Sequence, residues 1–444
     1  MKSCILKGRI LLATLVLSSL SNAKAESAIS ETQIERFATA ITQIHHYYLK
    51  PVSYQNLFDF AIRGMLTSLD PHSDYLSPQD IRDLQDTTSG EYAGIGIEII
   101  PDNGLIKVIS PLSEAPAEKA GIIPGDIIVK VDDKFVKDIS SDEAIALIKG
   151  PEGTIVELTV IRAELKDSLK FKIKRELIKT QSVKSKLYRN KIGYSKISTF
   201  GENTAQELKD AIIEFNKNNN ISGLVIDLRN NPGGLLTSAI EVSDLFLDRK
   251  NTSYNGMIVY TKGRLDIDNT EAHATPGDIF NNKPIVVIIN NGSASASEIV
   301  AGALKDQKRA IILGTRSFGK GSVQTVIPID YESAIKLTTS LYYTPNGTSI
   351  QASGIIPDVY TPYTQINESD KKDNIQDMLT NISEQNLSGH LSHPSAKAHN
   401  DSKQVLERKQ EQAQLAYKDL QLFQSLNLIE AMSVRNQSNS GATK

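Results

Sequence analysis

The chain has 444 residues, of which 40% are hydrophobic and 23% are charged, as is ordinary for a soluble globular protein. At roughly 150 residues per domain, this length suggests about three domains. The 49 basic and 52 acidic side chains give a net charge of −3, which argues against a nucleic-acid-binding protein built on positive charge. A single cysteine excludes a disulfide framework and a cysteine-based structural zinc site.

Residues 1–25 have the pattern of a secretory signal peptide. Basic residues precede an apolar run at 10–20, and small residues stand at Ala23 and Ala25, where a signal peptidase reads the chain. The apolar run is short for a permanent membrane span, although an uncleaved anchor is the alternative. We therefore expect an exported protein of the periplasm or cell envelope, and cleavage after Ala25 would remove the single cysteine, Cys4.

Residues 26–88 predict a helical N-terminal region, because apolar side chains such as Ile34, Phe37 and Ile41 recur at the spacing of one helical face. A turn-rich stretch at 68–78 interrupts this pattern. Residues 89–176 predict a small β-domain with two short helices. In this domain we expect strands at 94–99, 105–109, 124–131 and 154–162, and helices at 115–121 and 141–149.

Residues 177–363 alternate strands and helices, which is the pattern of a layered α/β domain. Near-continuous aliphatic runs predict strands that are covered on both faces. These strands are expected at 223–228, 284–289 and 310–313, and helices at 204–216, 235–246 and 296–306. A polar linker at 364–401 precedes a helical C-terminal segment at 402–444, so the sequence predicts a multidomain α/β protein.

A run of small residues at 290–298 (Asn-Asn-Gly-Ser-Ala-Ser-Ala-Ser-Glu) leads from a buried strand into a helix. A serine at this place would lie beside the free N–H groups and the positive end of the helix dipole, and these groups can hold an oxyanion. The simpler alternative is a helix cap, since serine is a favoured N-cap residue.

The segment 314–324 places Lys320 between two glycines, where its stem is either exposed or directed into a cleft. The segment imitates a phosphate-binding P-loop, but Gly321 stands where serine or threonine is required, and the next residues predict a strand instead of a helix. A neutral lysine can instead act as the general base of a serine, provided that desolvation lowers its pKa. Such a pair needs no histidine.

Two consecutive glycines, Gly233 and Gly234, follow the buried strand at 223–228. Glycines let a backbone N–H group approach a substrate closely. We expect this turn to supply a second oxyanion donor beside the N–H group of Ala296. The alternative is a strand–helix turn with an Asp227–Arg229 ion pair.

Histidine offers a weaker route to catalysis. Of the 7 histidines, His273 alone falls within the α/β region, in a predicted loop, and we expect it to be a surface residue. A Ser–His–Asp hydrolase that uses His273 is the alternative. The scattered histidines offer no metal site with sensible ligand spacing, and neither a metal nor a cofactor is expected.

Together these segments are similar to the C-terminal processing peptidases, also called tail-specific proteases, from about residue 30 to 360 and again at 417–422 in the terminal helix. The resemblance implies that Ser295 is the nucleophile and that Lys320, 25 positions later, is its general base. It also implies that Gln324 orients the lysine. The polar stretch at 365–400 departs from the family.

Residues 90–175 resemble a PDZ domain, and Gly94, Ile95, Gly96 and Ile97 are similar to its carboxylate-binding loop. Such a loop captures a terminal carboxylate with backbone N–H groups while the peptide adds as a strand to the sheet edge. The resemblance implies a serine endopeptidase that cleaves proteins near exposed C-terminal tails. The alternatives are a PDZ domain that gates the active site or binds a partner, and a non-catalytic PDZ scaffold of the cell envelope. An adaptor protein and a homo-oligomer are further partners that the sequence allows.

Overall fold

The computed structural model describes residues 29–163, 165, 167–189, 191–219, 221–363, 412 and 414–441. The expected signal peptide at 1–25 and the expected linker at 364–401 lie outside these residues. In the part of the chain that is described, no helix combines the length and the apolar character needed to span a bilayer. The chain divides into two compact units between Tyr75 and Leu76.

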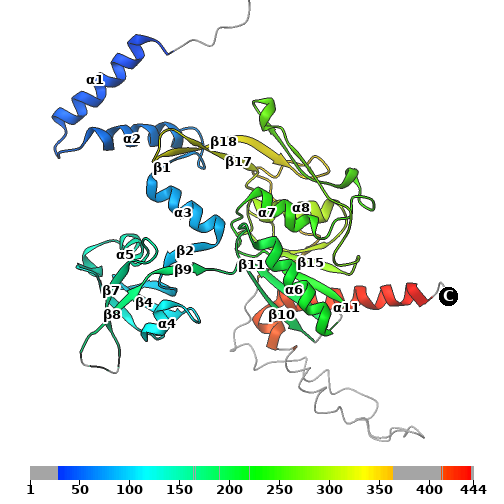
Figure 1. The fold of residues 1–444 in the computed structure, drawn as a ribbon. Helices are drawn as coiled ribbons and strands as arrows, with labels where there is room; N and C mark the ends of the chain where they lie inside the picture. The colour runs from blue at the N-terminus through cyan, green and yellow to red at the C-terminus, as the bar shows by residue number, and fades with distance from the viewer. Residues whose placement is uncertain are drawn as a thin grey trace, which may run out of the picture. The chain divides into compact units, whose positions relative to one another are not determined.

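The first unit holds the helices α1 (Glu31–Tyr47) and α2 (Tyr54–Thr67), and the short strand β1 (Asp74–Leu76) lies at its end (Figure 1). The Ser30 side chain accepts from the Gln33 N–H group and the Gln33 side chain accepts in return, which is a capping box. Ser53 caps α2 in the same position. The expected helices are confirmed, and β1 lies within the turn-rich stretch at 68–78 that interrupts them.

The second unit begins with helix α3 (Pro78–Ser89), which leads into the small β-domain. The main sheet of this domain has the order β3-β4-β5-β7-β8, with β6 beside β5, and β2 pairs with β9 where the chain enters and leaves. The strands are β2 (Glu91–Gly94), β3 (Ile97–Asp102), β4 (Leu105–Pro111), β5 (Ile127–Val131), β6 (Lys134–Phe135), β7 (Ile155–Ile161), β8 (Leu169–Lys174) and β9 (Glu176–Lys179). The helices are α4 (Pro116–Ala120), the 3₁₀ turn η1 (Val136–Asp138) and α5 (Ser141–Ile148).

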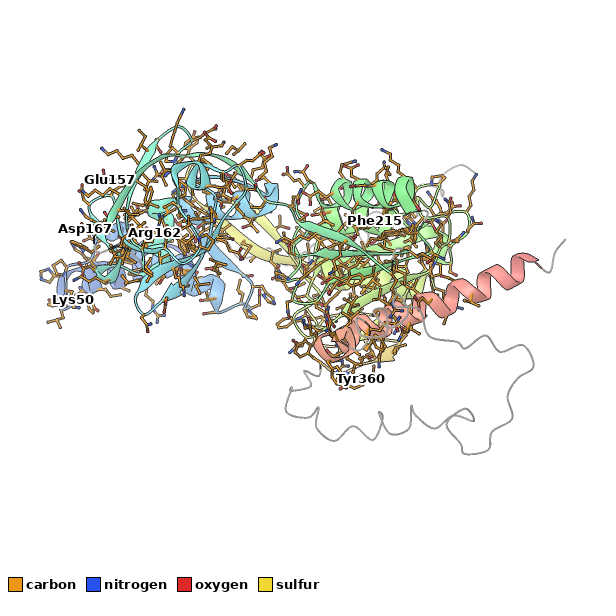
Figure 2. All side chains as sticks on the ribbon, turned by 90° about the horizontal axis from the view of Figure 1, so that it is seen from below. Lys50, Glu157, Arg162, Asp167, Phe215 and Tyr360 are labelled. Carbon is orange, nitrogen blue, oxygen red and sulfur yellow. The ribbon has the colours of Figure 1, made fainter. Side chains whose placement is uncertain are left out.

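Alternation along the strands builds the core of the β-domain. In β7, Val156, Leu158 and Val160 are fully buried while their neighbours face outward, because successive side chains of a strand point to opposite faces. Figure 2 labels Glu157 on the outer side of this strand and Arg162 just after it. The expected helices and strands are confirmed, and β2, β6, β8 and β9 are additions.

The α/β core is built on a sheet of order β10-β11-β12-β15-β16-β19 in the described chain. Within this sheet β11, β12, β15, β16 and β19 run parallel, and β10 is antiparallel at one edge. The strands are β10 (Val183–Tyr188), β11 (Ile192–Ile197), β12 (Gly223–Asp227), β15 (Ile285–Ile289), β16 (Ile311–Gly314) and β19 (Val359–Tyr360). The helices are α6 (Thr204–Asn219), α7 (Leu236–Asp244), α8 (Ala296–Asp306) and α11 (Leu420–Gly441).

Both faces of this sheet are covered, as the aliphatic runs predict. Leu224 and Ile226 pack with α6, α7 and α8 on one face. Val225 and Val286 pack against Leu426 and other apolar residues of α11 on the other face. Figure 2 labels Phe215 on α6 and Tyr360 at the end of β19.

A second sheet carries the long hairpin β17 (Ser322–Pro328) and β18 (Ala334–Tyr343), with β13 (Met257–Gly263) beside β18 and β14 (Glu271–His273) beside β13. The 3₁₀ turns η2 (Tyr254–Gly256) and η3 (Asp266–Asp268) flank β13. The expected strand after Lys320 is therefore confirmed as β17, and the P-loop alternative, which requires a helix there, is excluded.

Three parallel strands end at the same edge of the core sheet. The strands β12, β15 and β16 end at Asp227, Ile289 and Gly314. The loops that leave them span 228–235, 290–295 and 315–321. Open α/β sheets bind their ligands at the carboxyl ends of the strands, so the fold brings the three expected catalytic segments to one place.

Candidate active site

Ser295, Lys320, Gln324 and Gly234 all line one cavity of about 600 Å³. Apolar side chains form much of its wall, namely Ile81, Leu84, Leu235, Leu236, Ile299, Val323 and Val326. The two side chains expected to react and the backbone expected to hold an oxyanion therefore share a cavity. Its apolar wall can accommodate apolar substrate side chains.

The nucleophile loop holds Ser295 in a strained conformation. Its backbone has φ 54° and ψ −113°, directly before the first residue of α8. An N-cap residue normally has an extended backbone, and a non-glycine residue at positive φ carries strain of the kind found at active sites. The next N–H group, that of Ala296, has no hydrogen-bond partner in the described chain and lies at the positive end of the helix dipole.

The glycine turn at 233–234 packs directly against this serine. A Cβ atom on Gly233 would lie 2.8 Å from the Cβ atom of Ser295, so a larger residue does not fit. The Gly233 N–H group donates to the Oδ1 atom of buried Asn231 at 2.9 Å. The Gly234 residue lines the cavity, and its N–H group has no partner among the described residues.

Glu298 joins the nucleophile loop to the lysine loop. Its carboxylate, 1% exposed, accepts from the N–H groups of Ser295 at 2.8 Å, Gly319 at 2.7 Å and Lys320 at 2.9 Å, and from the Ser317 hydroxyl at 2.6 Å. Burial raises the pKa of Glu298, against the hydrogen bonds that lower it. An ionised carboxylate offers about four acceptor sites, so these four donors fill it.

Tyr342 holds the other side of the lysine backbone. Its hydroxyl donates to the Lys320 carbonyl and lies within hydrogen-bonding reach of the Ser295 side chain. Burial and the nearby Glu298 raise the pKa of this phenol well above its ordinary value, so it stays protonated. The backbone of Lys320 is therefore held at its N–H group by Glu298 and at its carbonyl by Tyr342.

Sequence reasoning missed Glu298 and Tyr342. Glu298 ends the quoted nucleophile motif, and a carboxylate three residues into a helix is a recognisable capping signal. Tyr342 carries no such signal. It reaches the site because β17 and β18 pair, and its own N–H group donates to the Gly321 carbonyl at 2.9 Å.

Gln324 lies in the cavity with Ser295 and Lys320, whereas His273 does not line it. The Gln324 side chain lines the cavity, and its amide donates to the Ser322 hydroxyl at 2.9 Å and the Thr338 hydroxyl at 3.3 Å. His273 lies on β14, where its ring contacts the Asn255 carbonyl at 3.0 Å and a glutamate at 3.2 Å. It is not among the residues that line the cavity. Across the described residues there is no cluster of side chains able to hold a metal ion.

The loop at 94–97 of the β-domain presents backbone donors. Ile95 is buried in the domain core, and its carbonyl accepts from the Ala117 N–H group at 2.9 Å. Gly96 has φ +71°, and a Cβ atom there would lie 2.4 Å from the Ala115 Cβ atom. In the described chain the N–H groups of Ile95 and Gly96 have no partner. A carboxylate is the kind of group that such free donors can bind.

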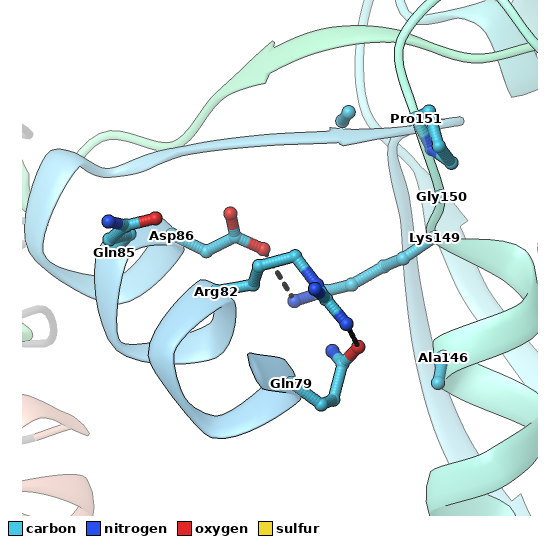
Figure 3. Close-up of a pocket in the computed structure, with 9 residues that line it drawn as sticks. Gln79, Arg82, Gln85, Asp86, Ala146, Lys149, Gly150 and Pro151 are labelled. Atoms are coloured by element: carbon cyan, nitrogen blue, oxygen red, sulfur yellow. Dashed lines mark hydrogen bonds and ion pairs between the residues drawn. The ribbon is translucent and has the colours of Figure 1, made fainter. Parts of the chain in front are cut away.

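A second cavity lies between α3 and the end of α5 in the β-domain (Figure 3). In it Lys149 pairs with Asp86 at 3.1 Å, and Arg82 donates to Gln79 at 2.8 Å. Helix α3 borders the Ser295 cavity with other side chains, Ile81 and Leu84 among them. One helix thus borders both the β-domain and the candidate active site.

Comparisons with known proteins identify families to which parts of the chain are similar. Peptidase family S41 matches residues 191–361, and a PDZ domain matches residues 108–162. A family described as "Activating protease CtpB N-terminal domain" matches residues 13–79. A carboxy-terminal-processing protease of Bartonella bacilliformis is 44% identical over 79% of this chain and 80% of that protein. The carboxy-terminal processing protease CtpA of Bacillus subtilis is 38% identical over 77% of this chain and 72% of that protein.

Among solved structures, the photosystem II D1 C-terminal processing protease is 30% identical, and the match covers 75% of this chain and 94% of that chain with a TM-score of 0.44. The family matches and the sequence relatives define a serine-type peptidase that carries a PDZ domain. The sequence relatives are specific enough to place it further: the chain belongs to the carboxy-terminal-processing proteases of peptidase family S41.

Proposed function

We propose that Ser295 and Lys320 form a Ser–Lys catalytic dyad in this protease. The observation that carries the proposal is that both side chains line one cavity while Glu298 binds the backbone N–H groups of both residues. Neutral Lys320 takes the proton from the Ser295 hydroxyl, and the serine oxygen attacks the scissile carbonyl. Lys320 then protonates the leaving amine, and a water molecule activated by the same lysine hydrolyses the acyl-enzyme.

The tetrahedral oxyanion is assigned to the N–H groups of Ala296 and Gly234. Gly234 is preferred to Gly233 because the Gly233 N–H group already donates to Asn231. Oxyanion donors are worth about 10²- to 10³-fold in kcat when one is removed. Gln324 is assigned the role of orienting Lys320, in keeping with its place in the same cavity.

Substrate selection is assigned to the PDZ domain. The free N–H groups of Ile95 and Gly96 support capture of a protein's C-terminal carboxylate at the Gly94–Ile97 loop. The chain upstream of that carboxylate would then reach Ser295, so that cleavage falls near the C-terminus. In this proposal the PDZ domain spans residues 89–176 and the peptidase core spans residues 177–363. Residues 1–25 direct export of the protein. An adaptor protein or a second copy of the chain is a further partner.

Three variants test the dyad. We would express the chain from Glu26 and follow cleavage of a substrate protein that ends in an apolar tail. We expect cleavage by the wild type and none by Ser295→Ala, Lys320→Ala or Lys320→Arg, because arginine stays charged and cannot act as a base. His273→Ala should retain full activity, since His273 does not line the cavity. Cleavage that survives both Ser295→Ala and Lys320→Ala would overturn the dyad.

The second candidate function is a PDZ scaffold that binds tails without cleaving them. The partly exposed ion pairs between Lys149 and α3 suit a related role, in which the PDZ domain gates the peptidase by changing its seat on α3. Tail binding without cleavage by any variant, the wild type included, would support this candidate.

A further inference from the structure

Helix α11 approaches the carboxyl edge of the core sheet with its first turn. The Asp419 carboxylate lies just before this helix and accepts from the Leu422 N–H group at 3.0 Å, as an N-cap residue does. The side chain of the next polar residue, Gln421, is 1% exposed and donates to the Thr361 carbonyl at 2.8 Å. The beginning of α11 is therefore fixed against strand ends of the core.

A largely enclosed arginine, Arg229, joins this helix to the turn that carries Gly234. The Arg229 guanidinium donates to both oxygens of Asp419, at 2.8 and 2.7 Å, and to the side-chain Oε1 atom of Gln421 at 3.2 Å. It also donates to Asp227, with its closest contact at 2.6 Å. Fork-shaped contacts of this kind fix an arginine in orientation as well as position.

The cluster holds one positive side chain, Arg229, between two carboxylates, Asp227 and Asp419. Asp227 is 1% exposed and also accepts from the Tyr194 hydroxyl at 2.8 Å. Burial alone would lower the pKa of Arg229, but its bonds to Asp227 and Asp419 hold it above the ordinary value. The Asp419 side chain is 24% exposed and Arg229 is 11% exposed, so Asp227 is the buried carboxylate of the cluster. Removal of a partner from such a largely enclosed ion pair is costly, because the remaining charge stays without a partner.

Arg229 stands next to the residues that build the oxyanion turn. Asn230 exchanges hydrogen bonds with Asn290 of the nucleophile loop, at 2.9 and 2.8 Å. The Asn231 carbonyl accepts from the Ala294 N–H group at 3.0 Å, and the Asn231 side chain accepts from Gly233. The position of Arg229 is thus transmitted over a few bonds to both the glycine turn and the nucleophile loop.

We infer that Arg229 and Asp419 are positioning residues through which the C-terminal helix α11 sets the geometry of the oxyanion turn. The inference rests on the proposed function, in which Gly234 and Ala296 hold the oxyanion. It makes α11 part of the active-site architecture, beyond its role as an apolar cover of the sheet. A shift of about 1 Å in such a turn is enough to cost on the order of 10²-fold in rate.

The test compares two ways of weakening α11. Asp419→Asn removes the charged partner of Arg229 at the helix start. Leu426→Ala leaves that contact intact and removes a fully buried apolar side chain from the same helix. We would measure kcat and KM on a peptide substrate, the melting temperature, and labelling of Ser295 by a fluorophosphonate probe, with the whole chain from Glu26.

We expect Asp419→Asn to lower kcat at least tenfold while KM changes less than twofold. Leu426→Ala should lower the melting temperature more than Asp419→Asn does and keep kcat within twofold of the wild type. Arg229→Lys, which keeps the charge and loses the fork, should behave like Asp419→Asn and serves if that variant does not fold. Equal kcat for Asp419→Asn and wild type, or an equal loss in Leu426→Ala, would overturn the inference. A wild type that is neither active nor labelled at Ser295 would instead overturn the proposed function on which it rests.

Discussion

The loops of the candidate active site and the PDZ domain are held in place by different kinds of contact. Buried charged groups hold the loops: Glu298 is 1% exposed and binds four donors, and Asp227 is equally buried around Arg229. The PDZ domain contacts α3 through Lys149, whose side chain is 32% exposed and pairs with Asp86 and Asp83. The buried contacts are costly to break, whereas half-exposed ion pairs contribute little. The difference indicates firmly held loops at the candidate active site and an adjustable seat for the PDZ domain.

The largest effect is expected at Glu298. Glu298→Gln replaces one acceptor oxygen by an NH₂ group, which faces N–H donors and cannot accept from them. The backbones of Ser295 and Lys320 then lose a shared anchor, and we expect kcat/KM to fall about 10²-fold or more. Steady-state cleavage of a peptide substrate measures this loss.

Glu207→Gln is the matched control for this variant. Glu207 also accepts from a hydroxyl and a backbone N–H group, those of Ser182 and Val183, at 2.8 and 2.9 Å. It lies in the first turn of α6 and does not line the cavity. Activity lost equally in both variants would show that Glu298 matters for stability alone.

Acidification is expected to lower the activity, although protonation of Glu298 does not by itself destabilise the folded protein. Burial raises the pKa of Glu298, so the folded protein takes up this proton at a higher pH than the unfolded chain does. The stability contributed by the protonated form is present below the unfolded pKa and is lost as the pH rises through the folded pKa. Activity has the opposite sign, because a protonated Glu298 leaves a donor unpaired and a protonated Lys320 is no base.

We therefore expect kcat/KM to be highest at neutral to alkaline pH and to fall about tenfold per unit where one essential group is protonated. The measurement is a pH profile of cleavage, with melting temperature followed over the same range. Activity that stays unchanged down to pH 4 would rule out Lys320 as the base.

The sequence alone predicts some parts of the fold and of this site better than others, depending on the kind of contact that forms them. The aliphatic runs at 223–228, 284–289 and 310–313 predict β12, β15 and β16 to within a residue or so, because burial on both faces leaves a local signal. Helix α8 is predicted with its bounds, since small residues end and a helical apolar pattern begins at Ala296. Strands such as β10, with polar residues and an edge position, leave no such signal.

The tertiary contacts were beyond sequence reasoning. The place of Tyr342 follows from the pairing of β17 with β18, and that of Asp419 from a chain segment 190 residues after Arg229. The choice between Gly233 and Gly234 depends on which N–H group the Asn231 side chain takes. Local patterns cannot report these relations, because each joins residues that are distant in the chain.

A smaller effect is expected from loosening the PDZ domain internally. Leu158 is fully buried in the core of this domain, and Leu158→Ala should cost about 2–5 kcal/mol of its stability. We expect cleavage that depends on a C-terminal tail to fall, while fluorophosphonate labelling of Ser295 keeps its wild-type rate. Calorimetry together with the labelling assay checks this separation. A parallel loss of labelling would mean that the loops around Ser295 depend on the PDZ core and are not held by their own buried contacts alone.

The smallest effect is expected at the contact between the PDZ domain and α3. Lys149→Met keeps much of the apolar stem, which lies near the Tyr92 ring, and removes the charge that pairs with Asp86 and Asp83. Because the pair is partly exposed, we expect a stability loss below about 1 kcal/mol, and a smaller one at high salt. The informative readout is the ratio of cleavage with and without a tail that ends in a free carboxylate. A changed ratio with unchanged stability would show that this contact sets how the PDZ domain controls Ser295. An unchanged ratio would show that the Lys149 contact does not control cleavage at Ser295.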